Sequence, residues 1–365
     1  MIMGGLDRIM NVIIMAGGAG TRFWPVSRSH YPKQFLKIIG PHPLIEETYL
    51  RIAPLVEEKR IYIVVHEAHK ELVKEIFKGR EVRVVTEPSG RNTAPCIGLG
   101  LIHIMEEYGD GPVVVLPADH YIGDVAAFQD AICSAVSVVD KGGIVTIGIV
   151  PSRPETGYGY IKRGEPLLGD KEVFRVEAFV EKPSPELATQ FLSEGNHYWN
   201  AGIFVFRAQA MMEEFRRYLP EVYEGLGYLR DSLGRSNFEK RLKEVYQRIT
   251  SISIDYGVME RTTSDLFVIP GHFPWSDVGS WQAIFELRSH ERDEDGNLLD
   301  GNTVVLNCKS TFVYSRSERL IGCIGLEDII VVDTPDALLV SHRGSTQDVR
   351  RCVEIIKERG LEEFL

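Results

Sequence analysis

Residues 11–35 read NVIIMAGGAGTRFWPVSRSHYPKQF, and this stretch decides the fold. An apolar run at 10–15 leads directly into a glycine-rich turn. Glycine lets a backbone turn tightly and approach a ligand closely, and consecutive N–H groups in such a turn form a concave anion site. Arg22 adds a guanidinium that can grip phosphate oxygens, and Lys33 adds a second positive charge. The stretch therefore predicts a buried strand followed by a loop that holds a polyphosphate.

Two better-known phosphate loops do not fit this turn. A dinucleotide fingerprint needs a third glycine where this chain has Phe23, and a Walker loop needs its Gly-Lys pair where this chain has Arg22. A glycine-rich turn without a ligand is the alternative. Three glycines together with Arg22, Lys33 and the stiffening Pro25 and Pro32 within twenty residues favour a ligand loop.

The glycine run with its Thr-Arg pair, and the PKQF ending at 32–35, resemble the signature of sugar-1-phosphate nucleotidylyltransferases. The PKQF ending is most similar to that of mannose-1-phosphate guanylyltransferases, also called GDP-mannose pyrophosphorylases. The resemblance implies that the loop binds the nucleoside triphosphate and that Arg22 and Lys33 act in catalysis by steadying the leaving pyrophosphate. The nucleotide-binding residues that it implies here are Ala16, Gly17, Gly18, Gly20, Thr21, Arg22 and Lys33.

The length and net charge of the chain limit the class of protein to which it can belong. A chain of 365 residues exceeds the usual single core, so we expect a catalytic domain at 10–290 and a smaller C-terminal domain at 300–365. The net charge of −11 argues against nucleic-acid or membrane partners. No apolar run approaches a membrane span, and the first residues lack the layout of a signal peptide. Five scattered cysteines without metal spacing predict reduced thiols in the cytoplasm.

Short β-rich runs alternate with helical patterns through the first part of the chain, which predicts βαβ units and a doubly wound, mostly parallel, Rossmann-like sheet. Ligands bind such sheets at the carboxyl ends of the strands, where the glycine loop lies. The expected strands are 11–15, 60–66, 82–86, 112–116 and 143–149, and the expected helices are 44–56, 68–77, 93–107 and 126–139.

The loop EPSGRNTAP at 87–95 follows a strand and opens a helix. Asn92 or Thr93 is a plausible N-cap, Gly90 allows close backbone approach, and the exposed amides can read a base edge. A plain capped helix start accounts for the residues equally well. The segment resembles the one that borders guanine in guanylyltransferases, which implies that GTP is the nucleotide and that Gly90, Arg91, Asn92, Thr93 and Ala94 bind it.

Two carboxylates are candidate metal ligands. Asp119 in LPADH (116–120) follows an apolar strand, which is a usual place for a metal ligand, although from the residues alone an ordinary loop residue is the favoured interpretation. Asp277 lies in WSDVGSW (275–281), a loop before a helix. The family resemblance implies that both are catalytic and hold Mg²⁺, which takes one or two carboxylates plus phosphate oxygens. Spacing alone does not pair them.

The candidate sugar site comes from segments GYGYI, FVEKP, WNAGIF and SIDYGVME, which resemble the mannose 1-phosphate pocket of the same family in the same order. Amide and carboxylate oxygens suit sugar hydroxyls and an ammonium suits the sugar phosphate. For Asp255, a carboxylate favoured by the helix N-terminal dipole is an equal alternative. The residues assigned to sugar-phosphate binding are Gly159, Glu181, Lys182, Asn200 and Asp255.

The rest of the chain predicts structural roles. The charged helical patterns at 208–249 indicate a mainly solvated insertion without chemistry. Short β-rich runs at 303–306, 311–314, 320–324, 329–333 and 337–342, with a closing helix at 346–357, predict a small all-β unit resembling a short β-helix. Related enzymes use such a unit in dimer contacts, so we expect a homodimer. No isomerase-like segment follows, so we expect no phosphomannose isomerase activity.

The resemblance thus implies a GT-A-like nucleotidyltransferase domain with a C-terminal β-helix-like domain, which transfers GMP from GTP to mannose 1-phosphate with Mg²⁺. Two alternative functions remain open at this point. The first is a nucleotidylyltransferase that uses another base or sugar, and the second is a catalytically silent regulatory subunit that binds nucleotide sugars. A DxD glycosyltransferase is disfavoured because no DxD follows the strand before Asp119.

Overall fold

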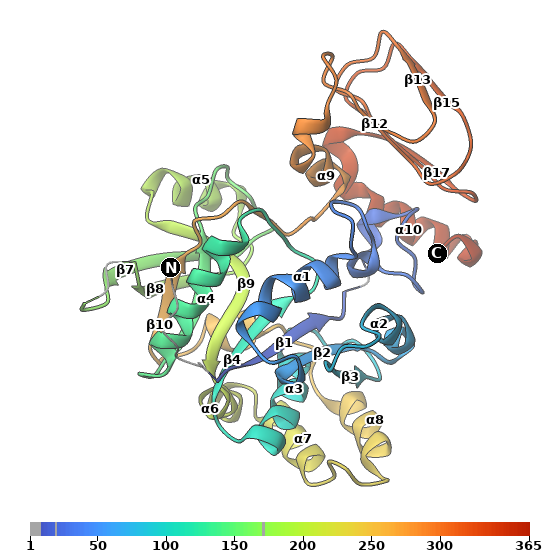
Figure 1. Ribbon diagram of the computed structural model, residues 1–365. Helices are drawn as coiled ribbons and strands as arrows, with labels where there is room; N and C mark the ends of the chain where they lie inside the picture. Colours follow the sequence, from blue (N-terminus) through green and yellow to red (C-terminus); the bar gives the residue numbers. More distant parts are fainter. Residues whose placement is uncertain (1–8, 19, 170–171) are drawn as a thin grey trace. The chain divides into compact units, whose positions relative to one another are not determined.

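The computed structural model describes residues 9–18, 20–169 and 172–365, and its contacts divide the chain into two compact units (Figure 1). The first unit comprises residues 9–17, Thr48–Ala118 and Ile122–Trp275. The second unit comprises Gly18–Glu47, Asp119–Tyr121 and Ser276–Leu365. Each unit is built from segments far apart in sequence. The consecutive domains at 10–290 and 300–365 stay a prediction.

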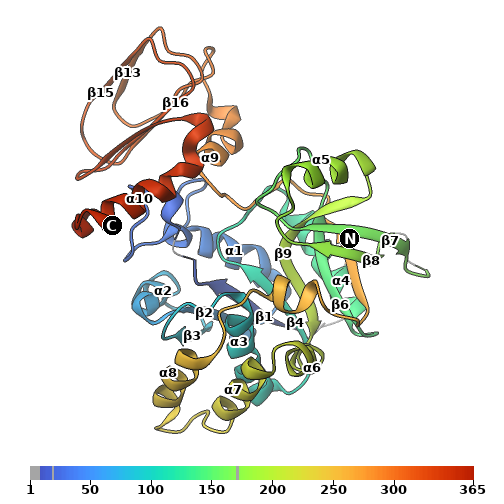
Figure 2. The same cartoon turned by 180° about the vertical axis from the view of Figure 1, so that it is seen from behind.

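A mixed sheet forms the first unit, with nine strands among the described residues in the order β3-β2-β1-β4-β9-β6-β10-β8-β7 (Figures 1 and 2). β3, β2, β1 and β4 run parallel, as do β6 and β10, whereas β9 is antiparallel to β4 and β6. The strands are β1 (Asn11–Ala16), β2 (Ile61–His66), β3 (Arg83–Glu87), β4 (Pro112–Pro117), β6 (Ile144–Ile149), β7 (Tyr160–Pro166), β8 (Phe174–Val180), β9 (His197–Arg207) and β10 (Leu266–Pro270).

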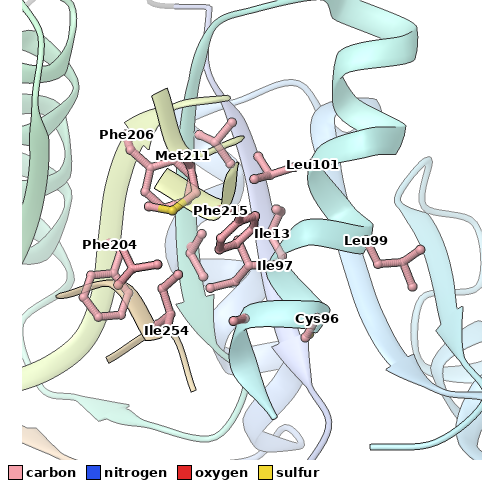
Figure 3. Packing of buried hydrophobic residues seen from close by; sticks show 14 of the residues in the cluster. Ile13, Cys96, Ile97, Leu99, Leu101, Phe204, Phe206, Met211, Phe215 and Ile254 are labelled. Atoms are coloured by element: carbon pink, nitrogen blue, oxygen red, sulfur yellow. The ribbon is translucent and has the colours of Figure 1, made fainter. Parts of the chain in front are cut away.

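Helices cover both faces of this sheet. α3 contacts β1, β2 and β3, and α4 contacts β4, β6, β9 and β10. Ile13 of β1 joins a cluster with α3 and α6 that Figure 3 shows from close by, while its neighbours Val12 and Ile14, which point to the other face, are also fully buried. The predicted doubly wound α/β class is confirmed. The helices are α1 (Leu44–Ile52), α2 (Lys70–Ile76), α3 (Thr93–Tyr108), α4 (Val125–Val139), α5 (Pro185–Glu194), α6 (Ala208–Tyr218), α7 (Pro220–Arg230) and α8 (Phe238–Arg248).

The expectation of a solvated insertion at 208–249 is wrong. α6, α7 and α8 each place apolar side chains in the main core, among them Met211, Leu226 and Tyr246. Charged residues crowd the outer faces of these helices and conceal the apolar stripe, which recurs at helical spacing. This region is therefore part of the structural core of the first unit.

The parallel strands bring their carboxyl ends to one edge of the sheet. Met15 of β1 pairs with Pro117 of β4, and His66 of β2 pairs with Glu87 of β3. The turn that starts at Gly17 and the loop that starts after Glu87 therefore leave the sheet at the same edge, where ligands bind doubly wound folds.

The second unit contains a short parallel β-helix. β12 (Leu298–Asp300), β14 (Phe312–Ser315) and β16 (Ile329–Asp333) stack in parallel, β17 (Leu338–His342) joins β16 antiparallel, and β13 (Thr303–Leu306) pairs in parallel with β15 (Ile321–Ile324). Val313 and Val331 point into the coil against two buried cysteines, while the alternate Phe312 and Ile330 pack in a cluster with α9 (Trp281–Leu287). The predicted β-helix-like unit is confirmed, and α10 (Val349–Glu358) closes it.

Two short strands, β5 (Tyr121–Ile122) and β11 (Trp275–Ser276), complete the described strands. In the part of the chain that the structure describes, no helix combines the length and apolarity that crossing a membrane requires.

Candidate active site

The glycine turn has the geometry that its sequence predicts. β1 ends at Ala16, and Gly17 and Gly18 are exposed. Gly20 has φ of +60°, and a Cβ atom there would lie 2.4 Å from Cβ of Lys33, so only glycine fits this position. A 3₁₀ turn over Thr21–Phe23 follows, and its Phe23 N–H donates to the Gly20 carbonyl at 3.0 Å.

Lys33 joins the two predicted metal ligands. Its side chain is nearly buried, and its Nζ donates to Oδ2 of Asp119 at 2.7 Å and to the backbone carbonyl of Asp277 at 2.6 Å. All three residues belong to the second unit. Burial raises the pKa of Asp119, but the adjacent Lys33 ammonium, together with His120 and hydrogen bonds to the carboxylate, outweighs this effect and holds the pKa below its usual range. The structure thus brings together three residues that sequence spacing alone could not connect.

The donor chemistry of this cluster fits a divalent cation. The described residues hold no group of three or more His, Cys, Asp or Glu side chains arranged as a metal site. If Mg²⁺ binds here, the carboxylates of Asp119 and Asp277 would be its protein ligands, with phosphate oxygens and water in the other positions, as is common for Mg²⁺ sites. His120 is 3.9 Å from Asp119, measured from Nε2 to Oδ1, which fits a role in orienting the loop.

Arg22 has a neutral side-chain partner. Its Nη1 donates to Oε1 of Gln347 at 3.0 Å, and the described residues give it no ion-pair partner. Its charge is therefore available to an anionic ligand, whereas the charge of Lys33 is already shared with Asp119.

In the first unit, hydrogen bonds hold the EPSGRNTAP loop in place. Asn92 has φ of +68° and caps α3 by accepting from the Thr93 N–H at 2.9 Å. Thr93 Oγ1 accepts from the Ile254 N–H, the Ala94 N–H donates to the Ile252 carbonyl, and Nε of Arg91 donates to the Tyr246 carbonyl at 2.6 Å. A Cβ atom on Gly90 would meet open space, which leaves that backbone accessible. The predicted cap is present, and base recognition by this loop stays a prediction.

Glu87 is a residue that our sequence analysis missed. It ends β3, is only 2% exposed, and accepts a hydrogen bond from the Tyr246 hydroxyl at 2.9 Å. Its other oxygen, Oε2, lies 3.6 Å from where a Cβ atom of Gly17 would be. Burial raises the pKa of Glu87 to about 7, although hydrogen bonds from Tyr246 and Cys96 partly offset the effect. A charged residue at the last position of a buried strand was the only signal that the sequence offered.

The predicted sugar residues also converge, all in the first unit. Asn200 Nδ2 donates to Oδ1 of Asp255 at 2.8 Å, and the Asn200 N–H donates to the Gly159 carbonyl at 2.8 Å. Lys182 Nζ donates to Oε1 of Glu181 at 2.6 Å. A Cβ atom on Gly159 would lie 2.4 Å from Oε2 of Glu181, so any larger residue would have to displace the Glu181 carboxylate. The structure therefore brings the five predicted residues into one cluster.

The charged groups of Asp255 and Lys182 in this cluster have shifted pKa values. Burial, with repulsion from Glu181, raises the pKa of Asp255 to about 6. Burial lowers the pKa of Lys182, but its pairing with Glu181 outweighs this and leaves the pKa above its usual range. Asp255 opens a π-helical turn, Asp255–Met259, so the helix-start interpretation and the cluster contact hold together.

The comparisons with known proteins agree with this geometry. The nucleotidyl transferase family model matches residues 11–294, and the model of the MannoseP isomerase/GMP-like beta-helix domain matches residues 301–356. The Xanthan biosynthesis protein XanB of Xanthomonas campestris pv. campestris (strain B100) is 41% identical over 96% of this chain and 74% of its own length. The mannose-1-phosphate guanylyltransferase of Escherichia coli K12 is 38% identical, again over 96% of this chain and 74% of that protein.

A solved structure is also similar over nearly the whole chain. A Thermus thermophilus protein described as a mannose-1-phosphate geranyltransferase has a TM-score of 0.85 and 37% identity, covering 95% of this chain and 99% of that one. The fold and the two clusters define a nucleotidyltransferase enzyme. The chain belongs to the nucleotidyl transferase family, in the group that carries the GMP-like beta-helix domain. Enzymes of this family generally use a divalent metal.

Proposed function

We propose that this enzyme transfers GMP from GTP to α-D-mannose 1-phosphate, giving GDP-mannose and pyrophosphate. The convergence of Lys33, Asp119 and Asp277 beside the Arg22 turn carries the proposal, because it supplies cations for a triphosphate and carboxylates for Mg²⁺ in one unit. Relatives named mannose-1-phosphate guanylyltransferase, at 37 to 39% identity, support the choice of substrates.

The chemistry requires little acid–base help. A phosphate oxygen of mannose 1-phosphate, already anionic, attacks the α-phosphorus in line, and the bond from that phosphorus to the β-phosphate oxygen breaks. Arg22 and Lys33 hold the departing pyrophosphate and neutralise its charge. Mg²⁺ held by Asp119 and Asp277 would add charge neutralisation on the phosphates. Catalysis is then mainly positioning and electrostatic stabilisation.

The sugar cluster orients the nucleophile. Lys182 is the cation of this cluster and serves the phosphate of mannose 1-phosphate, while Glu181 and Asp255 accept hydrogen bonds from hydroxyls and Asn200 can accept or donate them. Gly159 keeps a side chain out of the space beside Glu181. The five residues thus act by positioning one oxygen for attack.

Glu87 supports guanine as the base. Guanine presents two adjacent donors, N1–H and the N2 amino group, and a carboxylate can accept from both, whereas adenine, uracil and thymine lack that pair of donors. Glu87 lies at the carboxyl edge of the sheet beside Gly17, and in the described part of the chain it has no ion-pair partner that would occupy its charge. The loop with Gly90, Asn92 and Thr93 begins immediately after it and would border the base.

The proposal is tested by measuring pyrophosphate release with Mg²⁺ and GTP against a panel of sugar 1-phosphates. Fast release with mannose 1-phosphate and slow release with galactose 1-phosphate supports it. Equal rates with all sugars, or binding of GDP-mannose without any turnover, would contradict it, and the second outcome would favour a silent regulatory subunit.

We further propose a homodimer that uses the outer face of the β13–β15 pair. Leu306 and Ile324 lie opposite each other in the parallel register and are more than half exposed, and Val304 is exposed on the same strand. Such adjacent apolar side chains are typical of an association surface. Leu306→Lys with Ile324→Lys should convert a dimer to a monomer in light scattering. An unchanged mass would rule out this face.

We place the enzyme in the cytoplasm. Its five cysteines, at positions 96, 133, 308, 323 and 352, form no disulfide within the described residues, as is usual where thiols stay reduced.

A further inference from the structure

The turn that carries Arg22 is held by residues from the other end of the sequence. The 3₁₀ turn Thr21–Phe23 contacts both α10 and the 3₁₀ turn Arg343–Asp348, all within the second unit. The ring of Phe23 packs edge-on against Trp281, with centroids 5.2 Å apart. This turn therefore does not depend on the glycine run alone for its conformation.

The stretch after the turn is fixed by two main-chain carbonyls. The Phe364 carbonyl accepts from Nε1 of Trp24 at 2.7 Å and from Nη1 of Arg28 at 2.5 Å. The Leu365 carbonyl accepts from the N–H and the hydroxyl of Ser29 at 3.2 and 3.0 Å. These contacts anchor the backbone on the carboxyl side of Arg22, and a flexible loop would not supply a fixed guanidinium.

The tip of Arg22 has one side-chain partner among the described residues, the amide of Gln347. That oxygen occupies one of the five N–H donors of the guanidinium and carries no charge. A carboxylate in the same place would form an ion pair and compete with phosphate for the same donors. A neutral acceptor orients the side chain and leaves its charge for an anion.

We propose that Gln347 is a positioning residue for Arg22: its neutral amide holds the guanidinium in place without consuming its charge, so that the remaining N–H groups receive the triphosphate of the nucleotide. The inference rests on the proposed function, because it assumes that Arg22 contacts the triphosphate. It extends the nucleotide site to a residue of the β-helix-bearing unit that no sequence motif marks.

The test compares two substitutions that add the same charge to one exposed turn. Gln347→Glu places a carboxylate against Arg22, whereas Ser345→Glu places one two residues away, on an exposed side chain that forms no hydrogen bond with the described residues. The dissociation constant of GTP is measured by calorimetry with Mg²⁺ and without mannose 1-phosphate. We expect about a tenfold weaker affinity in Gln347→Glu, shrinking in roughly 0.5 M salt, and less than about a twofold change in Ser345→Glu.

A double-mutant cycle separates positioning from general effects of charge or structure. In an Arg22→Ala background, Gln347→Glu should change the affinity less than about twofold. Gln347→Ala, which removes one neutral hydrogen bond, should lower kcat/KM for pyrophosphate release about fivefold. Thermal unfolding of each variant checks that the exposed substitutions leave the fold intact.

The outcomes distinguish two failures. Equal weakening by Gln347→Glu and Ser345→Glu, or weakening that persists without Arg22, would overturn the role of Gln347 while leaving the proposed reaction standing. Near-normal GTP binding and turnover in Arg22→Ala alone would instead overturn the role of Arg22 in the proposed function, and this inference with it.

Discussion

Glu87→Gln should make the protein more stable above neutral pH while weakening its binding of GTP. Glu87 is almost completely buried, and burial raises its pKa from the ordinary 4.5 to about 7. Because the folded state holds this proton more tightly than the unfolded state, the carboxyl favours folding least at high pH. Stability is therefore lost as pH rises from about 4.5 through 7, the reverse of the usual carboxylate in an ion pair.

The size of the effect follows from the shift. A displacement of about 2.5 units corresponds to roughly 3 kcal/mol once both states are deprotonated, at about 1.4 kcal/mol per unit. At about pH 5 the parent has already lost a small part of this stabilising free energy, and by about pH 8 it has lost nearly all of it. The difference in the free energy of unfolding between Glu87→Gln and the parent should therefore grow by about 2 to 3 kcal/mol between about pH 5 and pH 8. Glutamine is neutral throughout and can still accept from the Tyr246 hydroxyl.

The assay is denaturant unfolding of both proteins at about pH 5, 6.5 and 8, with GTP titrations at the highest pH. The matched control is Glu75→Gln, an exposed glutamate on α2. At that pH the Glu87 variant should bind GTP at least about tenfold more weakly, because an amide cannot accept from both guanine donors. Parallel pH profiles for the parent and Glu87→Gln would refute the buried-carboxylate argument, and unchanged GTP affinity would refute its role in base recognition.

Three further predictions concern the two clusters. Lys33→Ala should lower kcat for pyrophosphate release by roughly 100-fold or more, the scale of one lost transition-state contact, and turnover near the parent rate in stopped-flow measurements would remove Lys33 from the mechanism. Gly20→Ala should destabilise the protein by at least about 1 kcal/mol in denaturant unfolding, because the new Cβ would meet Lys33 in a left-handed backbone conformation; equal stability would contradict the turn geometry. The KM for mannose 1-phosphate should rise more steeply below about pH 6 in the parent than in Asp255→Asn, because protonation of Asp255, whose pKa is about 6, removes an acceptor; identical profiles would exclude that role.

The sequence located the elements well but not their directions. Each of β1, β2, β3, β4 and β6 lies within one or two residues of its expected position, because buried parallel strands read as uninterrupted apolar runs. That β9 lies antiparallel between β4 and β6 was not predictable, since strand direction depends on pairing partners far away in sequence.

Part of the candidate site was likewise predictable from the sequence, and part was not. The turn at Gly20 follows from its own residue types, and its requirement for glycine is local. The family resemblance implied that Asp119 and Asp277 converge, but the contact of Lys33 with both appeared only in the structure, because no spacing rule joins residues 86 and 244 positions apart. Gln347 escaped notice for the same reason: a lone exposed glutamine carries no chemical signal until the fold places Arg22 against it.

Pyrophosphate release with Mg²⁺ and mannose 1-phosphate, run in parallel with GTP, ATP, UTP and dTTP, tests the central claim most directly. We expect fast release with GTP and little with the other three, because only guanine offers paired donors to Glu87. Faster release with another nucleotide would contradict the role given to Glu87 and the loop that follows it, and no release with any of the four would contradict the proposed reaction itself.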